Sequence, residues 1–389
     1  MNRIPTLSDY VEEVQRCMRC GFCRTLCPSF SYIGWETSSP RGRMQLLKAY
    51  LDGQMSMNDA VKERIYECTL CGYCLWRCPA GVKTIDVLKA ARGHLLEMDK
   101  GLEGSKGLRR NLAMEHNIYG LQHDTRIDWL SYPWIGLKDK AQVGKKGAEI
   151  LYFVGCVCSY SGKKNMTGKA TMQILDKTGA NWTLLGKEEW CCGDPALLIG
   201  DLQYAIEAAK HNVEKARSLG IERVVTSCAG CYHTWKEEYP KLLGESLDIE
   251  VQHIVQYIEE SLKHGKLKIA HELKAIATYH DPCELSRLGG VIEEPRRVLR
   301  SIPGLEFREL PKNRYVSRCC GGGGDLKILK PELSMKIGER RIREAFDIDA
   351  SLVVSGCPAC ELQLMDAAQS IGKPIQVLNI AEVVARTIA

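Results

Sequence analysis

The sequence predicts a multidomain α+β protein. A mostly helical N-terminal module precedes two tandem α/β domains, each built on a small parallel sheet. Two observations support this fold class: two short runs of four cysteines flanked by helical patterns, and later cysteines that recur at a nearly constant interval. At about 100–200 residues per domain, 389 residues allow two or three domains. We expect the helical module at 1–100, a linker at 101–147, and the two α/β domains at 148–260 and 261–389.

The composition indicates the cellular compartment and the type of cofactor. The chain has 19 cysteines, and no apolar run approaches the roughly 18–20 residues of a membrane helix. The start, MNRIPTLSDYVEEVQRC, lacks the apolar stretch of a signal peptide. We therefore expect a cytoplasmic protein without a membrane span, which can still associate peripherally with a membrane through a partner protein. Disulfides do not persist in such a reducing compartment, so the cysteines point to metal.

The charge balance points to no nucleic acid. The formal net charge of +5 counts every cysteine as a neutral thiol. Thiolates around iron would cancel that modest excess, and no basic run is long enough to form a nucleic-acid footprint. We expect no nucleic-acid partner.

The first two cysteine runs share one spacing, C-x-x-C-x-x-C-x-x-x-C-P, ending at Pro28 and at Pro79. This is the run of bacterial two-cluster ferredoxins, in which the fourth cysteine of each run ligates the other cluster. One 4Fe–4S cluster is then predicted on Cys17, Cys20, Cys23 and Cys78, and the other on Cys68, Cys71, Cys74 and Cys27. Zinc is disfavoured because its four ligands come in pairs and do not cross in this way.

Helical patterns flank both runs. RGRMQLLKAYLDG at 41–53 places Met44, Leu47 and Leu51 at helical spacing before a glycine stop. After the second run, Thr84 is expected to cap a helix that begins at Ile85. In the linker, an aromatic patch of Trp129, Tyr132 and Trp134 is expected to pack at the module boundary rather than dock a partner.

The remaining cysteines reveal an internal duplication. Matched cysteines lie 127, 128, 129 and 129 residues apart, in the pairs Cys156–Cys283, Cys191–Cys319, Cys228–Cys357 and Cys231–Cys360. Cys192 and Cys320 complete a Cys-Cys-Gly sequence in each half. The leftover Cys158 is expected to be a small apolar filler with no chemical role.

Each half also repeats the order strand, helix, strand, helix, strand. The predicted strands begin at 150, 182 and 223 in the first half and at 275, 306 and 351 in the second. This order implies parallel sheets with helical crossovers. The cysteines then follow the carboxyl ends of strands and precede helix N-termini, where anions bind favourably. We expect five sulfurs to converge in each half.

Five thiolates exceed what one cubane cluster needs, and the residues alone leave three alternatives open. Four can bind a cluster with one spare, all five can hold a larger or more open cluster, or the adjacent pair can be redox-active. Adjacent side chains diverge, which suits two different irons of an extended cluster better than two corners of a cubane.

The cysteine pattern resembles the D-type iron–sulfur subunit of heterodisulfide reductase, which fuses a ferredoxin-like part with a duplicated Cys-Cys-Gly (CCG) part. The resemblance spans nearly the whole chain, including SSPRGRMQLL at 38–47, HDPC at 280–283 and GGGGD at 321–325. Iron–sulfur subunits of glycolate oxidase and of anaerobic glycerol-3-phosphate dehydrogenase, thiol:fumarate reductase and subunits of benzoyl-CoA reductase complexes share this architecture.

The resemblance implies a non-cubane 4Fe–4S cluster with five cysteine ligands in each half. The first would sit on Cys156, Cys191, Cys192, Cys228 and Cys231, and the second on Cys283, Cys319, Cys320, Cys357 and Cys360. Glu284 departs from the family pattern, since many relatives have histidine there. Two electrons cleave a disulfide but a cluster passes one at a time, so two facing clusters that each hold one thiolate suit that reaction.

Two functions follow from the resemblance. The first is a catalytic subunit that reduces a small-molecule disulfide with electrons from the ferredoxin clusters. The second is an electron relay between a flavoprotein dehydrogenase or acyl-CoA reductase and a quinone, cytochrome or bifurcating partner. No G-x-G-x-x-G follows a strand, so we expect no flavin or NAD site in this chain and redox-active partner subunits.

Two histidines and two arginines are candidates for supporting roles. His280 precedes the cluster edge and is a weak candidate for donating a proton to a leaving thiolate, although a hydrogen-bonded structural role is favoured; the same applies to His233. Arg41 and Arg43 are expected to be structural, with stabilisation of cluster charge or contact with a partner as the alternative.

Overall fold

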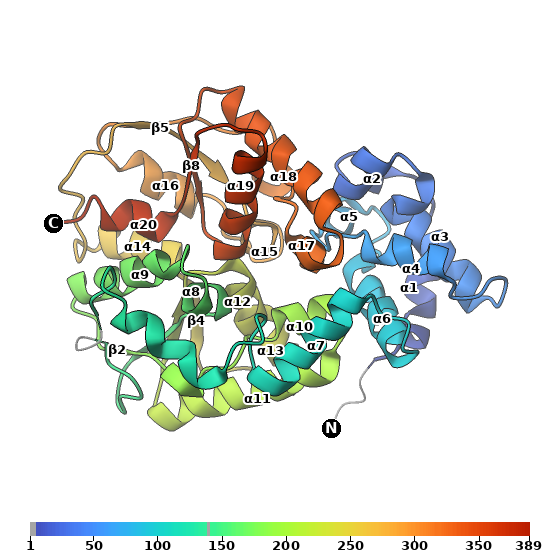
Figure 1. Ribbon diagram of the computed structural model, residues 1–389, viewed down its shortest axis with the longest axis horizontal. Helices are drawn as coiled ribbons and strands as arrows, with labels where there is room; N and C mark the ends of the chain where they lie inside the picture. The colour runs from blue at the N-terminus through green and yellow to red at the C-terminus, as the bar shows by residue number, and fades with distance from the viewer. Residues whose placement is uncertain (1–4, 138–140) are drawn as a thin grey trace.

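The computed structural model describes residues 5–137 and 141–389. Helices of the N-terminal part gather at one end of the molecule, and the two sheet-containing halves lie against each other beside it (Figure 1). This layout confirms the predicted fold class, with two small parallel sheets following a helical module. Among the described residues, no helix is both long and apolar enough to cross a membrane.

The N-terminal part is helical throughout. Its longer helices are amphipathic, and their buried positions include Met44 and Leu47 of α3 and Leu88 and Leu95 of α6. The elements are η1 (Leu7–Tyr10), α1 (Val11–Gln15), η2 (Phe22–Arg24), α2 (Pro28–Ile33), η3 (Glu36–Ser38), α3 (Pro40–Leu51), α4 (Asp59–Tyr66), α5 (Tyr73–Arg77) and α6 (Thr84–Glu97). The helix predicted at 41–53 is α3, capped by the Ser39 side chain.

One detail of α6 differs from the prediction. Thr84 is the first residue of the helix and Lys83 occupies the cap position, without a side-chain cap. The Thr84 hydroxyl lies 2.9 Å from Cys74 Sγ instead. The contact with sulfur therefore replaces the capping hydrogen bond that the sequence suggested.

The segment predicted as a linker contains α7 (Glu103–Glu115) and η4 (His123–Ser131), a helix and a helical turn that were not predicted. Within the aromatic patch, Trp129 is 1% exposed and packs against Gly168, where a Cβ would lie 2.7 Å from the indole. Trp134 is exposed, so only part of the patch packs. Residues 138–140 of this segment lie outside the described residues.

The first half carries a four-stranded parallel sheet in the order β2-β1-β3-β4. Its elements are β1 (Ile150–Phe153), α8 (Cys156–Tyr160), α9 (Asn165–Lys177), β2 (Trp182–Thr183), η5 (Gly186–Glu188), α10 (Asp194–Ile199), α11 (Leu202–Leu219), β3 (Arg223–Thr226), α12 (Ala229–His233), the π-helical η6 (Thr234–Glu238), α13 (Tyr239–Leu243), β4 (Glu250–His253) and α14 (Ile254–Lys263). The strand β4 was not predicted.

The second half repeats this sheet in the order β6-β5-β7-β8. Its elements are β5 (Ala275–His280), α15 (Cys283–Ser286), α16 (Glu294–Arg300), β6 (Leu305–Phe307), η7 (Arg314–Val316), η8 (Gly323–Asp325), α17 (Leu326–Leu329), α18 (Pro331–Phe346), β7 (Leu352–Ser355), α19 (Pro358–Ser370), β8 (Gln376–Asn379) and α20 (Ile380–Ala385). The fourth strand, β8, was again not predicted.

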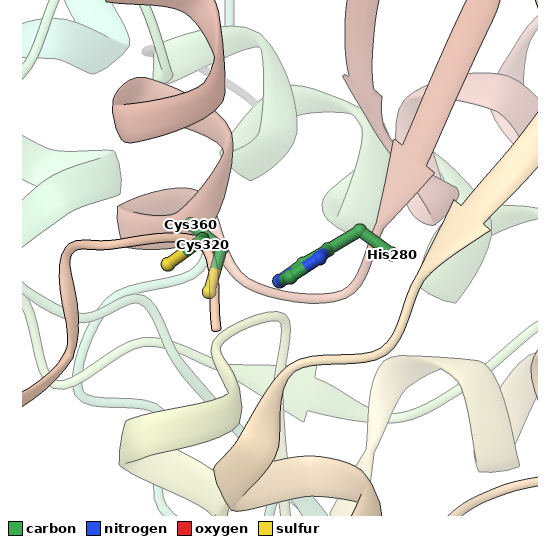
Figure 2. A group of neighbouring side chains, drawn as sticks. All are labelled: His280, Cys320 and Cys360. Carbon is green, nitrogen blue, oxygen red and sulfur yellow. The ribbon is translucent and has the colours of Figure 1, made fainter. Parts of the chain in front are cut away.

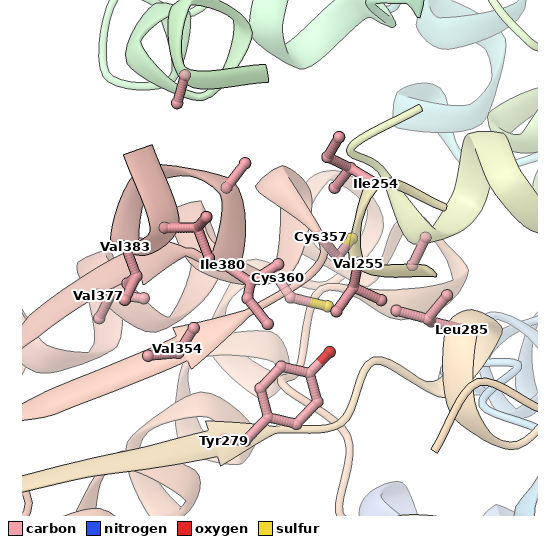
Figure 3. Packing of buried hydrophobic residues seen from close by; sticks show 14 of the residues in the cluster. Ile254, Val255, Tyr279, Leu285, Val354, Cys357, Cys360, Val377, Ile380 and Val383 are labelled. Atoms are coloured by element: carbon pink, nitrogen blue, oxygen red, sulfur yellow. The ribbon is translucent and has the colours of Figure 1, made fainter. Parts of the chain in front are cut away.

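The last helix of each half packs on the other half. Helix α14 contacts α16 of the second half, and α20 contacts α9 of the first. Ile254 and Val255 of α14 lie among Val354, Ile380 and other second-half residues in one buried cluster (Figure 3). The halves therefore share a core, and their exact domain boundaries stay a prediction.

Buried charges reinforce this exchange of helices. Lys164 of the first half contacts Glu361 and Glu382 of the second at 2.6 Å each, and Thr167 also donates to Glu382. Because an unpaired buried charge is costly, this network favours one relative position of the halves. The site described next lies between them.

Candidate functional site

The first cysteine group lies at the surface of the N-terminal part. Cys17, Cys20, Cys23 and Cys78 line a cavity of about 30 Å³ that Cys74 also borders. The turn that aims the first three sulfurs uses left-handed backbone at Arg19 and Gly21, with φ of 58° and 84°. Cys20 is the one exposed cysteine among all 19. These four residues are the predicted outer ligand set, and we refer to them as the outer group.

The second group is buried beneath it. Cys27, Cys68, Cys71 and Cys74 are all buried, and the turn again uses left-handed backbone, at Leu70 and Gly72. Burial, reinforced by nearby Cys68 and Cys71, raises the pKa of Cys74 well above its ordinary value. The same two sulfurs also act on Cys27, whose pKa burial raises to about 11. The structure thus brings Cys27 to the second run, as the crossed pattern requires, and these four residues form the inner group.

The arginines near these groups differ in burial. Arg43 is fully buried, acts electrostatically on Cys68 and Cys27, and donates through Nε to the Arg64 carbonyl at 2.5 Å. Arg41 borders the outer cavity and pairs with Glu36 at 2.8 Å. Each arginine therefore lies near cysteine sulfurs and also serves a structural contact.

A single cavity of about 130 Å³ lies between the two sheet-containing halves. Nine of the ten cysteines assigned to the halves border it: Cys156, Cys191, Cys192, Cys228, Cys231, Cys283, Cys320, Cys357 and Cys360. The tenth, Cys319, is buried beside it and accepts a hydrogen bond from Gly321 N–H at 3.3 Å. The residues predicted two convergent groups, and the family resemblance implied that their clusters face each other; in the structure both groups open on the same space.

Strand ends and helix starts position these sulfurs. Cys156 begins α8 shortly after β1, and Cys228 is the cap of α12 directly after β3. Cys283 and Cys357 occupy the corresponding places after β5 and β7. Backbone also approaches closely: a Cβ on Gly155 would lie 3.0 Å from Cys231 Sγ, and its φ of 77° favours glycine.

His280 lies behind the second group of sulfurs, at the end of β5. One ring nitrogen of His280 and the sulfurs of Cys320 and Cys360 all lie within 4.8 Å of one another (Figure 2). Arg341 Nε donates to His280 Nδ1 at 3.2 Å, so Nδ1 is an acceptor and Nε2 carries the proton. A metal-bound Nε2 would need the opposite tautomer. The geometry therefore suits an N–H donor toward sulfur better than a metal ligand.

The equivalent contact in the first half comes from Arg126. Its Nη1 and Nη2 lie 3.8 and 3.9 Å from Cys156 Sγ, and it pairs with Glu189 at 2.6 Å, both side chains being 1% exposed. Glu189 in turn accepts from Val154 N and Gly155 N at 2.9 Å. Sequence reasoning missed both residues, because Arg126 lies in the predicted linker and no spacing connects it to the cysteines.

Three carboxyl groups border the shared cavity: Asp194, Glu284 and Asp325. Burial raises the pKa of Asp194 to about 6 and raises that of Glu284 well above its usual range. Their mutual hydrogen bond favours the proton on Glu284, with Asp194 as acceptor. Burial also raises the pKa of Asp325, whose Oδ2 has no hydrogen-bond partner. The cavity thus holds protonatable groups as well as sulfurs.

The remaining candidate residues differ in whether they border the shared cavity. His233 does not border the cavity and lies 3.4 Å from Glu238. His280 does not border it either. Cys158 borders it and is fully buried beside Tyr152 and Ser227, which bond each other at 3.1 Å.

The inner group meets the second half directly. Arg287 Nη1 donates to the Cys71 carbonyl at 2.5 Å, and Cys71 acts electrostatically on both Cys283 and Cys319. A Cβ on Gly324 would lie 2.6 Å from the Cys68 carbonyl, so the GGGGD segment packs on the second cysteine run. The outer, inner and second-half sulfurs consequently form a connected series.

The donor set fits iron–sulfur clusters. All 19 cysteines are free, and backbone N–H groups of Leu70, Val82, Gly321 and Gly322 point at cysteine sulfurs over 3.3–3.4 Å. Such N–H groups stabilise thiolate and sulfide charge. The groups present therefore suit anionic clusters, and which cysteine binds which iron stays a prediction.

Comparison with known proteins agrees with this chemistry. Residues 13–82 match the "4Fe-4S dicluster domain" family, and 150–236 and 277–365 each match the "Cysteine-rich domain" family. The chain is 34% identical to the D-type subunit of the dihydromethanophenazine:CoB–CoM heterodisulfide reductase of Methanosarcina acetivorans, over 97% of this chain and 94% of that protein. It is 26% identical to an EtfAB:quinone oxidoreductase of Syntrophomonas wolfei, over 95% of this chain and 58% of that protein.

A solved structure shares the fold. A hypothetical protein from Helicobacter pylori superposes with a TM-score of 0.59 at 11% identity, covering 99% of this chain and 73% of that one. At this identity the likeness concerns the fold alone.

Proposed function

The chain belongs to the family of D-type heterodisulfide reductase subunits, and from that premise we propose that it passes electrons through two ferredoxin-type clusters to two non-cubane clusters that reduce a disulfide. At the coarser level it is an iron–sulfur subunit of an oxidoreductase complex. The finer proposal names the acceptor, a heterodisulfide or a similar small molecule. No flavin or nicotinamide site is proposed for the chain.

One observation carries the proposal most directly. Sulfurs of both halves border one cavity of about 130 Å³, so clusters held by the two groups would face each other across the same space. Two halves that acted independently would not need to share one cavity. The exchange of α14 and α20 holds the two groups in this relation.

The proposed ligand sets follow the observed grouping. The ferredoxin-type clusters take the outer group and the inner group as defined above. The non-cubane clusters take the five cysteines of each half, Cys156, Cys191, Cys192, Cys228 and Cys231, and Cys283, Cys319, Cys320, Cys357 and Cys360. We further propose the domain limits 1–100, 148–260 and 261–389, with 101–147 as the linker.

The proposed electron order follows from exposure and proximity. The outer group reaches the surface through Cys20 and the inner group is buried. Cys71 of the inner group acts electrostatically on Cys283 and Cys319 of the second half. Electrons would therefore enter at the outer group and reach the second half before the first. Because tunnelling falls steeply with distance, the proximity of Cys71 to Cys283 and Cys319 favours the second half as the receiving end.

The clusters would supply single electrons and hold sulfur of the substrate between them. Cleaving one disulfide to two thiols consumes two electrons and two protons. Asp194, Glu284 and Asp325 border the cavity and are the groups of this chain that can hold protons there. His280 stays a weak candidate for donating a proton, because it does not border the cavity, although one ring nitrogen lies within 4.8 Å of the Cys320 and Cys360 sulfurs.

Anaerobic reconstitution and assay test the proposal. Four clusters predict about sixteen irons per chain, and turnover of coenzyme M–coenzyme B heterodisulfide with reduced viologen is expected. Cys357→Ala should lower the iron content and abolish turnover, whereas Cys158→Ala should retain both. About eight irons in the wild type would contradict two full clusters in the duplicated half.

The second candidate is a pure electron relay. The similarity to an EtfAB:quinone oxidoreductase favours it, since a relay between a flavoprotein and a quinone needs no disulfide. In that case the clusters should be rapidly reoxidised by a quinone or cytochrome partner and not by the heterodisulfide. A quinone-linked partner would also place this chain peripherally at a membrane.

A further inference from the structure

Exposed apolar side chains surround the outer group. Met18 is 71% exposed and Phe22 is 51% exposed, and both belong to the loop that carries Cys20. Large apolar side chains exposed next to one another are more costly than scattered ones and often mark an interface. We call residues 16–25 and 76–83 the outer face, because both segments meet beside the outer cavity.

The outer face is basic. Its two segments contain five cationic residues and no carboxylate: Arg16, Arg19, Arg24, Arg77 and Lys83. Arg16 and Arg24 have carboxylate partners outside these segments, Glu13 and Glu36. Within residues 5–137 and 141–389, Arg19 and Arg77 have no carboxylate partner. Two guanidinium charges therefore remain uncompensated next to the exposed cysteine.

The basic and apolar groups are interleaved. The Arg77 guanidinium lies over the Phe22 ring at 5.6 Å, which joins the two segments of the outer face. Arg19 borders the same cavity as Met18 and Cys20. Aromatic residues, methionine and arginine are the types enriched at protein–protein interfaces, while aspartate and glutamate are depleted. The composition of the outer face matches that of an interface.

We propose that the outer face docks an electron-transfer protein whose own contact surface is rich in aspartate and glutamate. This proposal rests on the proposed function, because it takes the outer group as the electron entry. Within the complex, one electron would leave the partner's reduced cofactor and arrive at the outer group, with no bond or proton transferred. Opposite charge on the partner would raise the association rate and orient its cofactor toward Cys20.

The position of Cys20 favours a redox protein over an anionic membrane. Cys20 is the one exposed cysteine, and Met18 and Phe22 flank it in sequence and on the surface. A partner that covers these side chains brings its cofactor as near to the outer group as the chain permits. A lipid surface would cover the same residues without delivering an electron.

Stopped-flow reduction of the reconstituted full chain tests the proposal. The probe is a small acidic ferredoxin with two 4Fe–4S clusters, prereduced and mixed anaerobically at low ionic strength. The double variant R19E/R77E is compared with K266E/K268E, which makes the same change in net charge at exposed sites remote in sequence. We expect the second-order rate constant to fall at least about tenfold in R19E/R77E and to lose its dependence on salt. It should stay within about twofold of wild type in the control.

Two further measurements separate the alternatives. The reduction potential of the outer cluster is measured by an EPR-monitored titration, and we expect R19E/R77E to shift it too little to explain the slower reduction. If the shift in potential accounts for the whole loss of rate, the arginines only balance cluster charge and the docking proposal is wrong. Equal rates in all three proteins would also overturn it. The proposal would also be wrong if the chain bound vesicles containing anionic lipid through Met18 and Phe22 while the rate of reduction by ferredoxin stayed the same in R19E/R77E as in wild type.

The proposed function can fail separately. Methyl viologen radical is a cation and needs no docking surface, so it should reduce both variants at least as fast as wild type. Normal reduction by viologen without disulfide turnover would contradict the catalytic proposal and leave the docking result intact. Normal disulfide turnover together with equal ferredoxin rates in wild type and R19E/R77E would contradict the docking proposal and leave the catalytic proposal intact.

Discussion

Arg341 donates to Nδ1 of His280, and this contact determines what His280 can do. With Nδ1 as acceptor, the proton lies on Nε2, which points toward the sulfurs of Cys320 and Cys360 (Figure 2). The first half has Phe153 at the end of the corresponding strand, so its sulfurs receive no such contact there. The two halves therefore repeat the cysteines but differ in the groups that polarise them.

Removing the imidazole should lower the reduction potential of the second-half cluster. An N–H donor at sulfur stabilises the more negative, reduced state. We expect His280→Leu to lower the potential by on the order of 50 mV, while His280→Gln, whose amide can still donate, should stay near wild type. EPR-monitored redox titration measures both. Equal potentials in wild type and His280→Leu would show that the N–H contributes nothing.

The crossed assignment of the two ferredoxin-type clusters can be tested one ligand at a time. Cys78→Ser should disturb the cluster of the outer group and spare the inner one, because Cys78 borders the outer cavity. Cys27→Ser should do the opposite, since its electrostatic neighbours are Cys68 and Cys71. EPR of the reduced variants distinguishes the clusters by their relaxation and potential. The same cluster lost in both variants would contradict the assignment.

Arg92 should be the most sensitive structural residue outside the cysteines. It is fully buried and donates to the carbonyls of Ile65, Cys68, Leu198 and Gly324, which joins the N-terminal part to both halves. Arg92→Met leaves these carbonyls without donors, and we expect the free energy of unfolding to fall by about 3 kcal/mol or more. Urea titration of the holoprotein under argon measures it, with the exposed Arg110→Met as control. A loss below about 1 kcal/mol would mean that other donors replace the guanidinium.

His253 should make stability depend on pH. Burial lowers its pKa from 6.5 to about 4. Below pH 6.5 His253 binds a proton in the unfolded chain but stays neutral in the native chain. The free energy of unfolding should therefore fall by up to about 3 kcal/mol as the pH drops from 6.5 to 4, and it should not change above pH 6.5.

The chain itself supplies a matched variant for this test. His253 caps α14 by accepting from Val255 N, and Asn379 caps α20 in the second half by accepting from Ala381 N. His253→Asn should retain the cap and flatten the loss of stability with falling pH, measured from urea midpoints at each pH. The exposed His264→Asn should leave the slope as in wild type. An unchanged slope in His253→Asn would assign the acid sensitivity to other groups.

Much of the fold could be predicted because strand and helix periodicity is local. The strands β1, β3, β5 and β7 are mostly buried apolar runs, and they were expected in place. The outer strands β4 and β8, EVQH and QVLN, were missed because their outer residues are polar, as edge strands allow. Helix α7 was missed because its two glycines and its polar residues look like linker composition.

The sequence by itself predicted the two ferredoxin-type cysteine runs and the duplication that carries five cysteines in each half. Local spacing is enough for this, but it left three ways open in which the five sulfurs of each half can bind. Only the tertiary structure decided that both halves open on one cavity, that Cys71 of the inner group acts electrostatically on Cys283 and Cys319, and that Arg126 and His280 lie near different sulfurs. Those relations depend on how α14, α20 and Arg92 pack distant segments together. Such long-range packing produces no local pattern in the sequence from which it could be predicted.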